Sequence, residues 1–163
     1  MKNSAFELDQ SAGEIREGDI RYLMMRPDVL MGTLRYLDDC LRLQVLEAMT
    51  KSAYVYGRQS ISAYRNRAQL SSDNLLFTVF QMASQLGWGS WRYFASENGK
   101  STVTVINSPF STGFGSSSVP VCAPISGILG ALFAETHGAK VSLFECKCAS
   151  QGHGVCEFEI AIV

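Results

Sequence analysis

The cysteines are the feature of this sequence that most constrains its fold. Three of the five, Cys146, Cys148 and Cys156, fall within the last eighteen residues. Cys148 and Cys156 flank a turn that contains Gly152 and Gly154, so two strands joined by this turn would hold both thiols side by side. A shared metal ion requires that its ligands meet at one point. The end of the chain is therefore predicted to be a hairpin that can carry a zinc site.

Cys122 can supply a third thiol to the same site. It precedes a predicted helix, whose dipole would lower the pKa of the thiol. Spacing alone leaves the fourth ligand open among Cys146, His153 and Glu145, and softness favours Cys146 or His153 over a carboxylate. The alternative is that the cysteines are small buried apolar residues without a metal.

Composition places the chain among globular proteins. Apolar residues make up 47% and charged residues 18% of its 163 residues, and the net charge is −1. This charge argues against direct nucleic-acid binding, which normally needs a basic face. Residues 1–18 lack the pattern of a signal peptide, and no apolar run reaches the ~18 residues of a membrane helix. We expect a cytoplasmic protein with no membrane span, whose cysteines are metal ligands or free thiols.

The order of predicted elements indicates an α+β domain. Residues 1–18 are interpreted as a polar lead-in, and residues 19–163 as a single domain. Asn98-Gly99 is a strong hairpin signal, whereas residues 108–118 are expected to be a loop because they are rich in Ser and Gly. The predicted helices start at Pro27 and span 41–64, 73–86 and 124–136, and the predicted strands span 19–25, 91–95, 101–107, 141–144 and 156–163. We expect N-terminal helices packed on an antiparallel sheet with a C-terminal zinc-bound hairpin.

Several segments resemble the 4-vinyl reductase domain family. They are PVC at 120–122, GILGALFAE at 127–135, FECKC at 144–148 and GHGVCEFEI at 152–160. Further upstream, GDIRYLMM, AYVYGRQS, GWG and INSPF extend the resemblance over most of the chain from about Gly18. This family includes the ligand-sensor domains of phenol- and toluene-type transcriptional activators. The phenol sensors bind zinc through the pattern Cys, Glu, Cys, Cys.

The resemblance implies a complete set of zinc ligands. Cys122, Glu145, Cys148 and Cys156 are separated by 23, 3 and 8 positions, which match the sensor pattern without a gap. Cys146 would then lie outside the ligand set, as would His153. Glu145 and Cys148 have opposite parity on a regular strand, so both can reach one metal only if the strand bulges near Cys146.

The resemblance does not extend to the residues that hold phenol. In the phenol sensors a Trp and a His contact the phenol hydroxyl, but no Trp occupies the matching position here and no His precedes His137. A cavity could instead be lined by aromatic rings, although rings at helical spacing are also typical of an ordinary core. The candidate rings are Phe77, Phe80, Trp88, Tyr93, Phe110 and Phe114. We expect the loop at 108–118 to close over a cavity that holds an apolar, bulky ligand.

Three functions are compatible with these patterns. The first is a zinc-containing sensor or carrier for a hydrophobic small molecule, paired as a homodimer through helices within 27–64 and signalling through a separate protein partner. The second is an enzyme or accessory protein in tetrapyrrole or aromatic metabolism. A zinc ion with four protein ligands argues against catalysis, because it leaves no open position for water. The third is an assembly scaffold similar to TRAPP subunits.

Overall fold

The fold combines helices with two antiparallel sheets, as the sequence predicts. The computed structural model describes residues 6–95, 100–138 and 140–162. The elements are β1 (Glu7–Asp9), β2 (Glu14–Glu17), β3 (Ile20–Tyr22), α1 (Pro27–Gly32), η1 (Thr33–Tyr36), α2 (Asp39–Ala68), α3 (Ser72–Gln85), β4 (Ser90–Ala95), β5 (Lys100–Ile106), α4 (Pro109–Phe114), α5 (Ala123–His137), β6 (Val141–Lys147), η2 (Ala149–Gln151) and β7 (Cys156–Ile162). The α+β class is confirmed. No helix within the described residues is long and apolar enough to cross a membrane.

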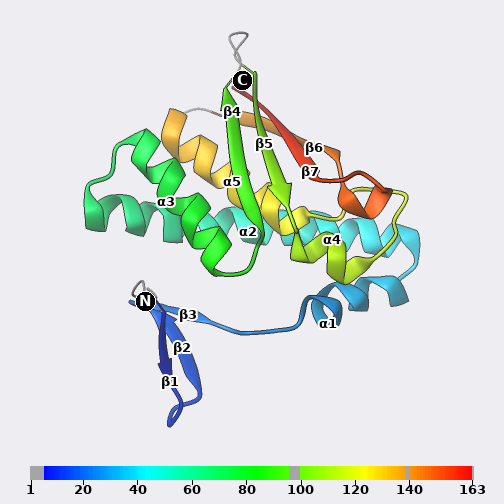
Figure 1. The fold of residues 1–163 in the computed structure, drawn as a ribbon, viewed down its shortest axis with the longest axis horizontal. Coiled ribbons are helices and arrows are strands. Elements are labelled where there is room, and N and C mark those ends of the chain that lie inside the picture. Colours follow the sequence, from blue (N-terminus) through cyan, green and yellow to red (C-terminus); the bar gives the residue numbers. More distant parts are fainter. Residues whose placement is uncertain (1–5, 96–99, 139, 163) are drawn as a thin grey trace.

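The main sheet has the strand order β4-β5-β7-β6, and every neighbouring pair is antiparallel. Helix α5 lies behind this sheet and α2 lies behind α5 (Figure 1). Alternation along the strands turns Val103, Val105, Phe158 and Ile160 into the core, because successive side chains point to opposite faces. The predicted turn at Asn98-Gly99 lies outside the described residues, but the strands on either side pair as expected.

Helix α5 is the centre of the molecule. It is apolar around its whole circumference and buried along most of its length, as expected for a helix covered on two sides. Its contact with α2 depends on Gly127, where a Cβ atom would clash with the carbonyl oxygen of Thr50 and with Ala53. Helix α5 ends at Gly138 in the left-handed conformation, as its sequence predicts.

The polar N-terminus forms strands that the sequence analysis did not predict. Strands β1 and β2 pair with each other, and β2 pairs with β3, in a small sheet that projects from the body (Figure 1). The turn between β1 and β2 is stabilised by Asp9, whose carboxylate accepts the backbone N–H groups of Ser11 and Ala12 at 2.9 and 3.0 Å. An exposed hairpin needs few apolar residues, so its composition resembled that of a lead-in segment.

The prediction of a long loop at 108–118 is partly wrong. Residues Pro109–Phe114 form helix α4, with Pro109 in its first turn and the side chain of Ser108 as its cap. Phe110 and Phe114 are four residues apart, which is a helical spacing, and they are 5% and 4% exposed. The Ser and Gly content obscured this spacing. The two rings belong to the core and not to a mobile cover.

Candidate metal centre and ligand cavity

Four residues from three parts of the chain meet in one buried cluster. One ligand atom from each of Cys122, Glu145, Cys148 and Cys156 lies within 4.8 Å of the others. Cys122 immediately precedes α5, Glu145 lies on β6, and the remaining two flank the η2 turn. The three cysteines are fully buried, and Glu145 is 7% exposed. This buried Cys/Glu cluster could hold a metal ion.

A bulge in β6 brings Glu145 and Cys148 to the same side. Glu145 pairs with Phe158 and Lys147 pairs with Glu157, so β6 advances two residues while β7 advances one. The extra residue is Cys146, as the parity of the two cluster residues requires. Without this bulge, Cys148 would point to the face opposite Glu145.

The spacing of the sulfur atoms fits a tetrahedral ion. The Cys122 Sγ atom is 3.9 Å from Cys148 Sγ and 3.5 Å from Cys156 Sγ. Zn–S bonds of about 2.3 Å at tetrahedral angles place two sulfur atoms about 3.8 Å apart. Glu145 Oε2 accepts the Cys122 backbone N–H at 3.0 Å, whereas its Oε1 is buried without a hydrogen-bond partner. A buried oxygen of this kind indicates a missing ligand.

The electrostatics of the cluster also favour a cation. Burial, followed by the neighbouring Cys148, raises the pKa of Glu145 to about 8. Hydrogen bonds to Cys148 and Cys156, together with burial, raise the pKa of the Cys122 thiol, so the lowering expected from the helix dipole is overturned. The hydrogen bonds from the other two thiols lower the pKa of Cys156. These buried acidic groups cannot all carry a negative charge side by side, and a divalent cation would stabilise their deprotonated forms.

The other candidate metal ligands lie outside the cluster. Cys146 Sγ approaches the carbonyl and carboxylate oxygens of Glu157, both at 3.4 Å, because the bulge turns it away from the metal site. His153 is exposed in the turn before β7. The preference for Cys146 or His153 on softness alone therefore selects the wrong side chains. Glu145 occupies the fourth position of the cluster.

The six candidate rings do not surround one space. Phe80 packs edge-on against Trp91, and Phe114 lies beneath the guanidinium of Arg42 at 5.8 Å. Tyr93 tilts against Phe133, while Phe110 packs edge-on against Trp88 with ring centroids 5.0 Å apart. Phe77 is 62% exposed on α3. Only Trp88 among the six lines the large apolar cavity.

This cavity lies between α2, α3 and α5 and has a volume of about 400 Å³. Its lining is neutral and mostly apolar. It consists of Tyr22, Met49, Ser52, Ala53, Tyr56, Gly57, Ser60, Ile61, Tyr64, Val79, Met82, Ala83, Leu86, Trp88, Pro124 and Ile128. The α2 contribution recurs at intervals of three and four residues from Met49 to Tyr64. This helical stripe, rich in small residues, was the one available sequence signal, but small residues have no distinctive chemistry.

Comparison with known proteins places the fold. Among solved structures, the phenol-responsive sensory domain of the transcription activator PoxR, crystallised with phenol, is similar with a TM-score of 0.82 and 16% identity, covering 96% of this chain and 84% of that one. A vinyl-4-reductase family protein from Methanocaldococcus jannaschii is similar with a TM-score of 0.54 and 17% identity, covering 87% of this chain and 98% of that one.

A trafficking protein particle complex subunit 3 from Naegleria fowleri, covalently bound to palmitic acid, reaches a TM-score of 0.53 at 15% identity, covering 84% of this chain and 95% of that one. At these identities the likeness concerns the fold. No curated protein sequence matches the chain. The family model of the 4-vinyl reductase domain matches residues 101–162, which include the whole cluster. The predicted resemblance is therefore confirmed, and residues 101–162 of this chain belong to the 4-vinyl reductase domain family.

Proposed function

We propose that this protein binds a neutral hydrophobic small molecule as a sensor or carrier. The observation that carries the proposal is the cavity of about 400 Å³ between α2, α3 and α5. Small-molecule sites are typically concave, mostly apolar and within this size range. None of the lining residues in the described chain is charged, so an ionised ligand would lose its hydration without compensation. The likeness of the fold to a phenol-responsive sensory domain supports the same function.

The ligand proposed from sequence keeps its chemistry but changes its place. Trp88 is retained as a contact residue, because it lines the cavity. Phe110 supports Trp88 from behind and acts on the ligand only through that ring. The ligand is therefore held mainly by the helical stripe of α2 and by Val79, Met82 and Ala83 of α3.

We infer that the cluster holds one zinc ion through Cys122, Glu145, Cys148 and Cys156. Three thiolates and a carboxylate are a donor set that zinc accepts, and together they fill its four positions. The ion would stabilise the start of α5 against the β6–β7 hairpin. Pro124 and Ile128 of α5 also line the cavity, so the same helix connects the metal site with the ligand.

The alternatives receive less support. The cavity lining offers no charged group and no thiol among the described residues, which disfavours acid–base or covalent catalysis there. An assembly scaffold does not need an internal cavity. The trafficking subunit holds its palmitic acid covalently, and a comparable attachment here would need a nucleophile such as a thiol, which the described lining does not contain.

We also propose a homodimer. Large apolar side chains remain exposed between residues 23 and 43, among them Leu23 and Met24 at 78% and 84%. Exposed apolar surface of this kind is typical of a protein interface. A second copy of the chain would cover this surface with an equally apolar one, and a separate protein partner would receive the signal.

The ligand proposal is tested by filling the cavity. Thermal shift and calorimetry with a panel of neutral aromatic and lipid-like compounds should reveal stabilising binders. Ser60→Trp places an indole in the cavity and should abolish that stabilisation. Gln59→Trp is the matched control, because Gln59 is exposed on the same helix and does not line the cavity. A panel in which no neutral compound stabilises the wild-type protein would contradict the proposal.

A further inference from the structure

The polar end of the cavity lies where the N-terminal sheet meets α2. Tyr22 of β3 and Tyr64 of α2 both line the cavity, and their hydroxyl oxygens are 3.2 Å apart. Both side chains are half-buried. Tyr22 is the one lining residue that the N-terminal sheet contributes in the described chain, so this pair joins two parts of the molecule at the cavity.

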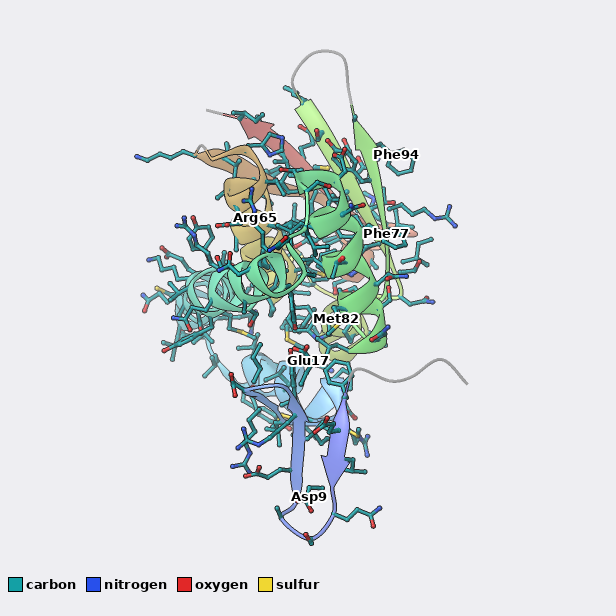
Figure 2. The ribbon with its side chains drawn as sticks, turned by 90° about the vertical axis from the view of Figure 1, so that its left-hand side faces the viewer. Asp9, Glu17, Arg65, Phe77, Met82 and Phe94 are labelled. Atoms are coloured by element: carbon teal, nitrogen blue, oxygen red, sulfur yellow. The ribbon has the colours of Figure 1, made fainter. Side chains whose placement is uncertain are left out.

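A buried carboxylate supports the tyrosine pair. Glu17 on β2 is 7% exposed, and its carboxylate is hydrogen-bonded with the hydroxyl of Tyr64. Figure 2 shows Glu17 where the N-terminal strands meet the helices. Burial is the largest of the causes that raise the pKa of both Tyr22 and Tyr64, so both hydroxyls remain protonated at neutral pH.

The number of protons decides what this end of the cavity can accept. A tyrosine hydroxyl carries one proton and two lone pairs. When Tyr64 donates to the carboxylate of Glu17, Tyr22 donates to the Tyr64 oxygen. The lone pairs of Tyr22 then remain available beside the cavity. This end of the cavity therefore presents a hydrogen-bond acceptor.

We propose that Tyr22 and Tyr64 form the polar recognition subsite of the cavity, selecting neutral apolar ligands that carry one hydroxyl or amino group as a donor. This inference rests on the proposed function and names its ligand class. An anionic ligand is excluded, because Glu17 lies behind the pair and the described lining provides no cation. A pure hydrocarbon would fit the apolar walls but would leave the Tyr22 acceptor without a partner. The N-terminal sheet thereby becomes part of the ligand site.

The test uses three probes of similar shape. We expect 2-naphthol to bind the full-length protein about tenfold more tightly than 2-methylnaphthalene, which corresponds to one net hydrogen bond. We expect 2-naphthoate to show no binding in the same calorimetric titrations. Hydrogen exchange provides a second measurement, since 2-naphthol should slow exchange in residues 7–22 more than 2-methylnaphthalene does.

Matched Tyr→Phe variants assign the effect to the pair. Tyr22→Phe and Tyr64→Phe should each reduce the preference for 2-naphthol to less than about threefold, because each removes a hydroxyl from the network. Tyr56→Phe is the control, since Tyr56 also lines the cavity but is 66% exposed, and the preference of this variant should remain about tenfold. If Tyr64→Phe fails to fold, as judged by circular dichroism, Tyr22→Phe alone decides the question.

The outcomes separate this inference from the proposed function. Equal binding of 2-naphthol and 2-methylnaphthalene to the wild-type protein overturns the subsite and leaves the ligand cavity intact. An undiminished preference in Tyr22→Phe overturns it as well. Binding of neither neutral probe, or of any other neutral compound, would instead remove the proposed function.

Discussion

The metal cluster and the ligand cavity both adjoin helix α5, but they are built in opposite ways. The cluster is small and closed, and its four side chains are at most 7% exposed. The cavity is large and apolar, and one of its walls includes a tyrosine from the small N-terminal sheet. A cluster of metal ligands tolerates little displacement, whereas apolar walls can adjust to different shapes. The difference suggests a rigid anchor beside a ligand site that can adapt.

The largest effect is expected from Cys148→Ser. Loss of this ligand should release the metal and lower the free energy of unfolding by about 5 kcal/mol or more, because structural zinc contributes about 10 kcal/mol in small domains. Elemental analysis and thermal denaturation provide the measurement. Cys146→Ser is the matched control and should retain one zinc per chain, since Cys146 faces Glu157. Wild-type protein purified without zinc would contradict the proposed centre.

The second largest effect is expected from Phe114→Ala. This ring is 4% exposed and packs beneath Arg42, away from both the cluster and the cavity lining. Truncation should cost about 3 kcal/mol in chemical denaturation, as for other large-to-small core changes. Both the zinc content and the affinity for neutral ligands should remain. A selective loss of ligand affinity in calorimetry would restore Phe114 as a contact residue.

Gly127→Val should separate the two regions with a smaller change in stability. Its added side chain would meet the backbone of Thr50 and Tyr54 and push α2 from α5, at a cost of about 2 kcal/mol. Because the cavity lies between these helices, ligand affinity should fall about tenfold or more. The metal cluster lies beyond the start of α5 and should retain zinc. Calorimetry and elemental analysis on the same sample check both outcomes, and loss of zinc would disprove the independence of the two regions.

The smallest effect on the fold is expected from the double variant Leu23→Glu/Met24→Glu. Both side chains are exposed, so the stability of a single chain should change by less than about 0.5 kcal/mol. The charges should nevertheless convert the proposed dimer into a monomer in sedimentation velocity experiments. Leu8→Glu on β1 serves as the control for an exposed apolar residue outside this segment. A monomeric wild-type protein would rule out the dimer.

The elements were predicted well where their patterns were local. Pro27 at the start of α1, Gly138 at the end of α5 and the flanking strands of the main hairpin follow from backbone preferences that neighbouring residues determine. The predictions failed where composition obscured periodicity. Serine and glycine hid helix α4, and polar side chains hid strands β1 and β2.

The sequence by itself determined which residues have the chemistry for a metal centre. Thiols and carboxylates are distinctive ligands, so the intervals between Cys122, Glu145, Cys148 and Cys156 carried information before any fold was known. That information was incomplete, since softness alone favoured Cys146 over Glu145. Tertiary structure decided between them, because the bulge in β6 turns Cys146 outward and brings Glu145 to the cluster.

Only the tertiary structure decided where the cavity lies. Its walls are ordinary side chains such as Ala53, Ser60 and Ile61, which would serve equally well in a packed core. A cavity exists where helices fail to fill the space between them, and this depends on their separation and angle. No single residue encodes those quantities. Tyr22 and Tyr64 are 42 positions apart, and they meet only because the small N-terminal sheet packs beside α2.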